Sequence, residues 1–392
     1  MTSPPHCSER PLSALLSQIL VAFTIEVDNA FELRMRAAGS SGAGLSLVVW
    51  SNLLQYARQE LSVGDLVAES LCDFRSVRHM LGCLERWEVV ALGHDAEDKR
   101  PEREGWGSGR GINLSTLIQP KRPALQASEL WPEVLAAVEK RWRDRFGVDE
   151  IGHLRVSLAK IIGQTDLALP RGFIDIRERK GPFRSKALEG THTLPLATLL
   201  AQALMLFALE FEPQSTAPLA LAANTVRVLS ETPVPAGDLA TLTGCSPEMA
   251  GIGWQIKPYI VVKPARLNVG KLVSLSPRGL SVQENYQRLA REIEKSWEKK
   301  FGEDAVRSLR NSCLYLFREG KEGGILLSEA LVPPLGVVRS GVALPALGRR
   351  VVRAAAQKRM RDMVRQTEAF VSDPAGSLPH YPMWDMNRGF RP

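Results

Sequence analysis

Two arginines, a serine and a histidine within one predicted helix are the residues best suited by type to bind a ligand. Arg75, Ser76, Arg78 and His79 share a face if residues 74–86 form a helix. An arginine can bond a guanine edge through two donors, and serine or histidine can bond a phosphate or a base edge. These four residues are therefore candidate nucleic-acid contacts, and an ordinary solvated helix face is the alternative.

Further candidate cations fall in two stretches between predicted strands. The first stretch mixes charges and offers Arg100, Arg103 and Arg110, of which Arg110, between two glycines, is best placed for a groove or a phosphate. The second stretch offers Lys263, Arg266 and Lys271 with no acidic residue beside them. Cations of this kind can touch a phosphate backbone without reading bases.

No catalytic constellation is visible. The glycine-rich residues 39–46 lack the lysine of a phosphate-binding loop, and the glycines of residues 105–111 are more typical of a loop tip than of a dinucleotide fingerprint. The six histidines never fall at metal-ligand spacing, and neither GxSxG nor HExxH occurs. We therefore expect no enzyme activity, no metal and no cofactor.

The composition is that of an ordinary globular chain, with 392 residues, 44% hydrophobic residues and a formal net charge of +7. The most apolar stretches, Leu12–Ile25 and Leu196–Phe211, are shorter than the ~18–20 residues that cross a bilayer. The five cysteines form no CxxC pair. We expect reduced thiols, no membrane segment and a cytoplasmic location.

The chain repeats itself. Residues Leu12–Glu26 return as Leu196–Glu210 with seven of fifteen positions identical. Residues Glu139–Arg155 return as Glu294–Arg310 with eight of seventeen identical. Blocks that match in the same order indicate a tandem duplication.

The repeated blocks carry two recurring features. One is a charged pair, Glu139 with Arg155 and Glu294 with Arg310, which predicts an ion pair between the last two helices of each copy. The other is aromatic: Trp142 with Phe146, and Trp297 with Phe301. Because these aromatic residues lie on apolar helix faces, they indicate a core or an interface rather than a ligand cage.

Within the first copy the apolar spacing predicts helices almost throughout. The expected elements are helices from residue 12, over 45–58, after the cap Ser62, over 74–86 after the cap Asp73, over 124–146 and over 149–162, with strands over 87–92 and 112–118.

This order of elements resembles the MarR-type winged helix-turn-helix family of transcription regulators. The resemblance rests on residues 61–90, which read as a short helix, a turn, a recognition helix ending in Leu84-Glu85-Arg86, and a first wing strand. It covers both copies but neither the linker nor the tail. It implies DNA contact through the recognition helix and wing, and flanking helices that pair as in a dimer.

Two departures stand out. The family usually has a glycine with a positive φ after the recognition helix, where this chain has Glu88 and Ile260, so the backbone there is expected to differ in both copies. In the second copy Glu248 replaces a cation, and Gly251 and Gly253 weaken the recognition helix.

We therefore expect a mainly α protein with small β-wings: two tandem winged-helix units arranged as a pseudo-two-fold intramolecular dimer, plus a basic helical C-terminal tail. The expected boundaries are a tail at 1–11, units at 12–163 and 194–318, a linker at 164–193 and a basic extension at 319–392, with its helix over about 346–370.

The expected function is transcriptional regulation, with double-stranded DNA read mainly through the first unit at an asymmetric site. The alternative is a protein-binding or ligand-binding winged-helix scaffold that has lost sequence-specific DNA binding. A small-molecule effector and further oligomerisation stay open as partners.

The difference between the copies gives a first prediction. Changing Glu248 to Ala should leave DNA affinity intact or strengthen it, because a carboxylate repels phosphates. Fluorescence anisotropy with a labelled duplex measures this change, and a tenfold loss of affinity would assign the reading role to the second copy.

Overall fold

The computed structural model describes residues 10–39, 45–93, 111–172, 193–245, 256–264 and 270–318, together with Leu327 and residues 378–382. Within these residues the protein is mainly helical and has two antiparallel sheets of three strands each. The predicted class, mainly α with small β elements, is confirmed.

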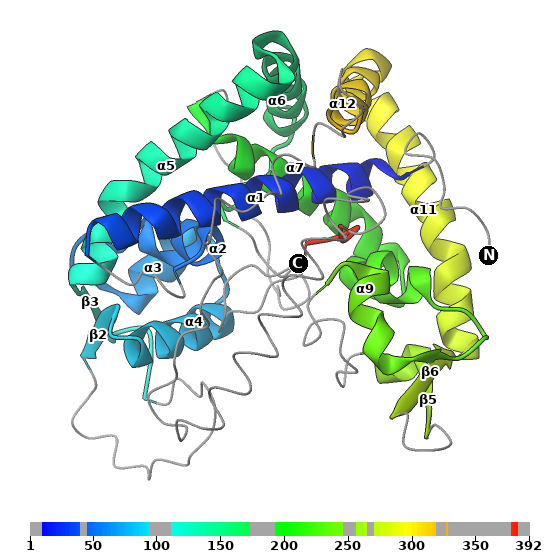
Figure 1. The fold of residues 1–392 in the computed structure, drawn as a ribbon, viewed down its shortest axis with the longest axis horizontal. Helices are drawn as coiled ribbons and strands as arrows, with labels where there is room; N and C mark the ends of the chain where they lie inside the picture. Colours follow the sequence, from blue (N-terminus) through cyan, green and yellow to red (C-terminus); the bar gives the residue numbers. More distant parts are fainter. Residues whose placement is uncertain are drawn as a thin grey trace.

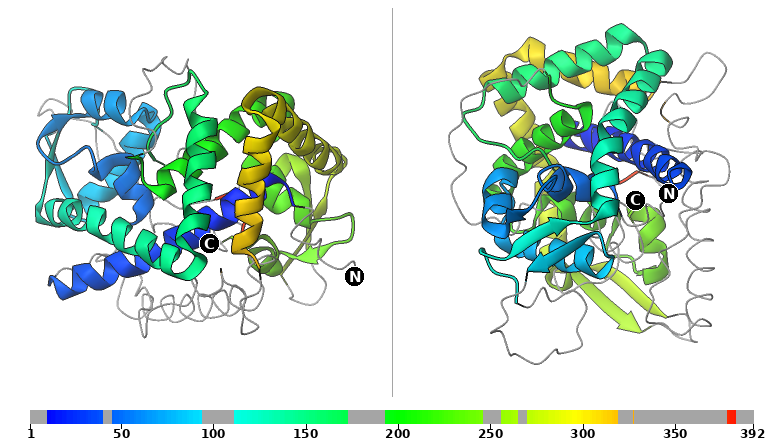
Figure 2. Two further views of the ribbon diagram at one scale, coloured as in Figure 1. Left: turned by 90° about the horizontal axis from the view of Figure 1, so that it is seen from above. Right: turned by 90° about the vertical axis from the view of Figure 1, so that its left-hand side faces the viewer.

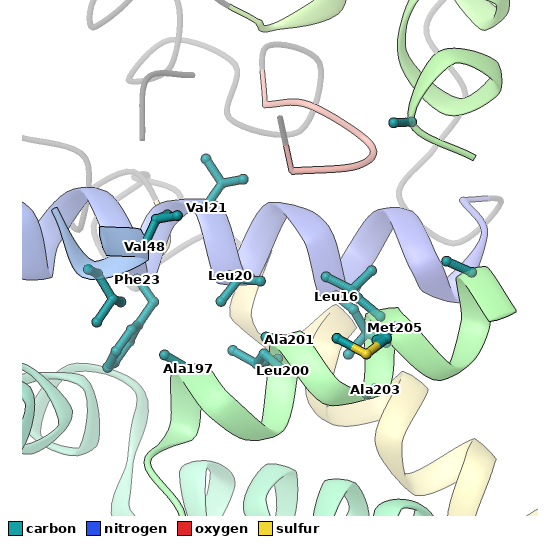
Figure 3. Close-up of a cluster of buried hydrophobic side chains, with 14 of the residues drawn as sticks. Leu16, Leu20, Val21, Phe23, Val48, Ala197, Leu200, Ala201, Ala203 and Met205 are labelled. Carbon is teal, nitrogen blue, oxygen red and sulfur yellow. The ribbon is translucent and has the colours of Figure 1, made fainter. Parts of the chain in front are cut away.

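Two apolar helices form the centre of the molecule. α1 (Leu12–Ala37) and α7 (Leu196–Phe211) pack against each other (Figure 1). Leu16 and Leu20 of α1 point toward α7, where small residues such as Ala203 let the two backbones approach (Figure 3). The predicted meeting of the two repeated segments is confirmed.

Both central helices are long and apolar enough to cross a membrane by length and composition alone, over Leu12–Met35 and Leu196–Gln214. The expectation that both stretches are too short was wrong, because α1 continues past Ile25 through Met35 and the helical stretch that starts at Leu196 continues to Gln214. Of the two apolar windows, 83% and 78% are buried inside the protein. Such burial is typical of core helices, which share this composition.

The first half continues from α1 into a broken helix, a sheet and two long helices. Its elements are α2 (Leu47–Val49), the π-helical turn η2 (Trp50–Leu54), β1 (Leu61–Ser62), α3 (Val63–Ser70), α4 (Phe74–Arg86), β2 (Val90–Gly93), β3 (Leu117–Pro120), α5 (Arg122–Phe146) and α6 (Val148–Gly163). β3 lies between β1 and β2, and the buried Leu92 pairs with the buried Ile118.

The described residues of the second half follow a similar order of elements. After α7 it contains the 3-10 turn η5 (Glu212–Gln214), α8 (Leu219–Leu221), the π-helical turn η6 (Ala222–Val226), β4 (Val234–Pro235), the 3-10 turn η7 (Ala236–Asp238), α9 (Leu239–Thr243), the 3-10 turn η8 (Lys257–Tyr259), β5 (Ile260–Pro264), β6 (Lys271–Leu275), α11 (Pro277–Phe301) and α12 (Glu303–Leu316). Its strand order, β4-β6-β5, matches that of the first sheet.

Two elements are shorter than the sequence predicts. The helix expected over 45–58 consists of α2 and η2 and ends at Leu54. The strand expected over 112–118 was wrong over most of its length, because β3 begins only at Leu117. The Asn113 side chain explains the difference: its Oδ1 accepts hydrogen bonds from the amides of Ser115 (2.9 Å) and Thr116 (3.0 Å). This local turn competes with sheet pairing.

Part of the predicted linker belongs to the core. Gln202 is a buried polar residue on α7, and its Nε2 donates to the carbonyls of Leu169 (3.3 Å) and Pro170 (3.1 Å). A buried amide requires such acceptors, so this stretch is held in place. Residues 173–192 and the predicted tail helix over 346–370 lie outside the described residues.

An aromatic triad recurs in the two halves, with each tryptophan between a phenylalanine of a central helix and one of its own helix. The triads are Phe23–Trp142–Phe146 and Phe207–Trp297–Phe301, all with edge-on ring contacts. All six side chains are buried. The prediction that the repeated aromatics are core residues is confirmed.

The repeated ion pairs are also confirmed. Arg155 Nη1 lies 2.9 Å from Glu139 Oε1, and Arg310 Nη1 lies 2.9 Å from Glu294 Oε2. Each pair joins the two last helices of its half, α5 to α6 and α11 to α12. The four side chains are largely shielded from water, so the charges are held in one register.

The same arginines reach across to the other half. Arg155 Nη2 donates to the carbonyl of Leu194, two residues before α7 (2.8 Å). Arg310 Nη2 donates to the carbonyl of Arg10, two residues before α1 (2.6 Å), and Glu294 Oε1 accepts from the amide of Leu12 (2.7 Å). Each half therefore holds the start of the other half's central helix.

Two glycine substitutions of opposite expected sign test the packing. A Cβ at Gly279 would overlap the Tyr259 carbonyl oxygen, so Gly279→Ala should destabilise the fold by about 1–3 kcal/mol. A Cβ at Gly152, inside α6, would meet no atom within 4 Å, so Gly152→Ala should stabilise by up to about 1 kcal/mol. Urea unfolding measures both free energies, and equal effects would contradict the packing at Gly279.

Candidate nucleic-acid interface

A capped turn sets the start of α4. α3 ends at Ser70, its C-cap Leu71 has a left-handed φ of 57°, and the chain then turns into Asp73. The Asp73 carboxylate accepts hydrogen bonds from the amides of Arg75 (2.9 Å) and Ser76 (3.0 Å). These bonds satisfy two free amides of the first helical turn. The predicted cap and the bounds of this helix are confirmed.

The inner face of α4 anchors it to the core. Val77, Met80, Leu81 and Leu84 are buried at helical spacing. The opposite face consists of the four candidate residues: Arg75 is exposed, and Ser76, Arg78 and His79 are half-buried. The structure thus places all four on one outward face.

Among these residues the Arg78 guanidinium lies 5.8 Å from the ring centroid of Phe74. No described carboxylate forms an ion pair with Arg78. Stacking on the ring holds the arginine stem without using the donors of its planar fork. Those donors remain able to bond an anion or a base edge.

The end of α4 corrects one expectation. Glu88 has a φ of 58°, the left-handed conformation that the family's glycine would supply, so the backbone there does not differ as the residue type suggested. A glutamate pays strain in this region of φ/ψ space that a glycine would not. In the second half Ile260 is extended, with a φ of −129°, as a strand residue should be. The expected difference is therefore present in the second copy alone.

The candidate loop cations divide into two groups. Lys263 and Lys271 are exposed on β5 and β6 and belong to two successive register pairs, Lys263–Leu272 and Pro264–Lys271. The structure brings these two cations to the same end of one hairpin. Arg100, Arg103, Arg110 and Arg266 lie outside the described residues, as does Glu248.

Figure 1 shows α4 and the β5–β6 hairpin on the same side of the molecule, opposite α6 and α12. The side view of Figure 2 agrees. Because α1 and α7 connect the halves at the centre, the helix and the hairpin that carry the candidate residues lie on one side of the molecule.

Sequence reasoning missed one cation beside the second hairpin. Arg278 is exposed in the first turn of α11, and its guanidinium lies 5.1 Å from the ring centroid of Tyr259. A cation at a helix N-terminus opposes the helix dipole. The sequence signal for Arg278 is this unfavourable position, a cation in the first turn of a predicted helix.

The described residues offer little for other chemistry. No group of three His, Cys, Asp or Glu among them could hold a metal ion. Burial raises the pKa of both the Cys245 and Cys313 thiols to about 12. A thiol with such a pKa is almost fully protonated at neutral pH and is a poor nucleophile. No protein-family model, curated protein or solved structure matches this chain.

The cap of α4 can be tested directly. Asp73→Ala removes both cap acceptors and should destabilise the fold by about 1 kcal/mol, whereas Asp73→Asn keeps an acceptor oxygen and should cost much less. Urea unfolding of the two variants and the unchanged protein provides the comparison. Equal losses for Ala and Asn would show that the carboxylate acts through its charge rather than as a cap.

Proposed function

We propose that this chain is a DNA-binding transcriptional regulator built from two tandem winged-helix units related by an approximate two-fold axis. The repeated strand order, the repeated aromatic triads and the reciprocal arginine contacts support this arrangement. In this proposal α3 and α4 form the helix-turn-helix of the first unit, and β2 and β3 begin and end its wing.

The observation that carries the proposal is the outward face of α4. A rigid helix that presents two arginines, a serine and a histidine from its first two turns has the size and the donors that a DNA major groove accepts. The buried inner face and the Asp73 cap hold this helix in place, so its donors are oriented before DNA arrives. Pre-orientation lowers the entropy lost on binding.

The second unit is proposed to hold the DNA backbone rather than read bases. Lys263 and Lys271 are exposed cations of the β5–β6 hairpin, which lies on the same side of the molecule as α4 (Figure 1). Each phosphate they neutralise would release counterions and add affinity at low salt. With Arg75 and Arg78 in one unit and Glu248 in the other, the preferred site is asymmetric rather than palindromic.

One observation favours the alternative of a protein-binding scaffold. Glu88 is an exposed carboxylate directly after α4. At that place it would lie near phosphates, where like charges repel. A scaffold would use the same outward face of α4 for an acidic protein partner and would show no preference among DNA sequences.

The test begins with a selected duplex. The full chain is used to enrich a pool of random-sequence 30-bp duplexes, and affinity for the enriched duplex and for the starting pool is then measured at several salt concentrations. Arg75→Ala/Arg78→Ala should lower affinity for the enriched duplex at least tenfold, since each arginine–guanine contact contributes about 1–3 kcal/mol.

A matched control removes the same charge elsewhere. Lys160→Ala/Arg307→Ala changes exposed cations of α6 and α12, on the side opposite α4. This control should change affinity only slightly and equally for both DNA samples. If no duplex is enriched, or if both double variants bind equally, α4 does not read DNA and the scaffold becomes the better proposal.

A further inference from the structure

A short segment near the C-terminus lies in the middle of the molecule. Residues Leu378–Pro382, drawn in red in Figure 1, lie beside α1 on the side away from α7 (Figure 3). Leu378 is fully buried and His380 is 4% exposed. The segment is therefore packed into the protein although 61 residues, 317–377, separate it from α12 along the chain.

Two polar residues of α1 hold the backbone of this segment. Ser17 Oγ donates to the carbonyl of Pro379 (2.9 Å), and Gln18 Nε2 donates to the carbonyl of Leu378 (3.0 Å). Arg10 Nη1 donates to the other end of the Gln18 amide, at Oε1 (3.0 Å), and so orients it. These contacts belong to the first half of the protein.

The second half holds the same segment through one amide. Asn224 Nδ2 donates to the carbonyl of Tyr381 (2.9 Å), and Asn224 Oδ1 accepts from the amide of Tyr381 (3.1 Å). This pair of bonds recognises a peptide group without regard to its side chain. Asn224 lies in the π-helical turn η6 and is fully buried.

The docked segment supplies hydrogen-bond acceptors to three buried polar side chains, those of Ser17, Gln18 and Asn224. Ser17, Gln18 and Asn224 are fully buried. A buried donor without an acceptor is strongly unfavourable. If these three positions of α1 and η6 served packing alone, we would expect apolar residues at them. Side chains from two different halves thus form one site, and an extended peptide backbone satisfies it.

The imidazole of His380 is held in an unusual environment. Its Nδ1 is buried and has no hydrogen-bond partner among the described residues. Burial, and then the nearby Arg227 and Arg10 guanidiniums, lower the pKa of His380 well below its usual value. The imidazole therefore docks in its neutral form.

Two neighbouring titratable side chains stay protonated and uncharged at neutral pH, and burial lowers the pKa of the nearby Arg227 from its usual value. Tyr286 of α11 and Cys245 face Arg227, and burial raises the pKa of each to about 12. Arg227 forms no ion pair with a described carboxylate, and its Nε donates to the carbonyl of Ala223 (2.8 Å). A proton on His380 would therefore add a third positive charge to a buried site with two.

We propose that α1 and η6 form a binding site for an extended peptide, that its occupant is the chain's own segment Leu378–Pro382, and that mild acid releases this segment. The segment bridges the two halves, because Ser17 and Gln18 belong to one and Asn224 to the other. Its release removes a link that holds the halves at their present spacing.

The direction of the pH dependence follows from the two states of His380. The docked segment carries a neutral imidazole, whereas a released histidine takes up a proton at a pH of about 6.5. Docking is thus fully favourable above about pH 6.5 and weakens as the pH falls below it, about tenfold per pH unit, until the lower pKa of the docked state is reached.

Hydrogen exchange of the full chain, followed by mass spectrometry at pH 7.5 and pH 5.5, tests the proposal without DNA. Rates are corrected for the intrinsic pH dependence of exchange. The fragment that contains His380 and Tyr381 should be protected at pH 7.5 and should lose about tenfold of that protection at pH 5.5. Fragments of α1 and α7 should keep theirs.

Three variants separate the site from the switch. His380→Gln should retain protection at both pH values, since its side chain cannot take up a proton. Asn224→Ala should lose protection at both, and Ser17→Ala, which removes one hydrogen bond, should lose about fivefold at both while keeping the helical circular dichroism. Ser17→Ala keeps the test valid if Asn224→Ala does not fold.

Three outcomes would overturn the proposal. One is protection of the unchanged chain that is equal at the two pH values. Another is an acid-induced loss in His380→Gln as large as that of the unchanged chain. The third is full protection of the segment in both Ser17→Ala and Asn224→Ala, which would show that it is not held by these side chains. Because no DNA is present, none of these results depends on the proposed DNA binding.

Discussion

The structure depends on the reciprocal contacts of Arg155 and Arg310. Each arginine pairs with a glutamate of its own half and donates to a backbone carbonyl that precedes the central helix of the other half. A shielded guanidinium needs both a counter-charge and acceptors for its remaining donors, and only the docked arrangement supplies them together. The contact therefore specifies the relative register of the halves, while the apolar surfaces of α1 and α7 supply most of the driving force.

This centre determines what the ends of the molecule can do. With α1 and α7 packed together and α6 packed against α12 through contacts such as Ser157 to Ser308 (3.0 Å), α4 and the β5–β6 hairpin both lie at the opposite side. The halves have nevertheless diverged in detail. Glu26 accepts from Trp142 Nε1 (2.8 Å), whereas Trp297 Nε1 has no partner among the described residues. Packing is repeated more faithfully than polar contacts, because several apolar residues fit one space but few polar groups fit one hydrogen bond.

The buried segment near the C-terminus adds a second polar link between the halves, of a different kind from the first. The arginine clamp joins charged side chains of long helices, but the segment is held mainly by backbone groups and by one neutral imidazole. A link that contains an imidazole responds to pH near neutrality, because that is where a histidine side chain normally titrates. The junction between the halves therefore combines the arginine contacts with a segment whose docking is proposed to depend on the protonation of His380.

Apolar periodicity and capping residues in the sequence were sufficient to predict most of the local helices. Apolar spacing predicted α4, α5 and α6 closely, and Ser62 and Asp73 were correctly predicted as the caps of α3 and α4. The duplicated blocks predicted the paired helices, the aromatic core and both ion pairs. These features depend on residues near in the chain or on a repeat that is visible in it. The outward face of Arg75, Ser76, Arg78 and His79 was predictable for the same reason.

Other features depend on residues distant in the chain, and only the tertiary structure decided them. The packing of α1 on α7 places α4 and the β5–β6 hairpin, which carries Lys263 and Lys271, on the same side of the molecule. The left-handed backbone at Glu88 also differs from what its residue type suggests. The docking of Leu378–Pro382 joins residues about 360 positions apart through backbone carbonyls, which every residue has and no sequence pattern distinguishes. Such contacts are selected by burial and geometry, and both exist only once the chain is folded.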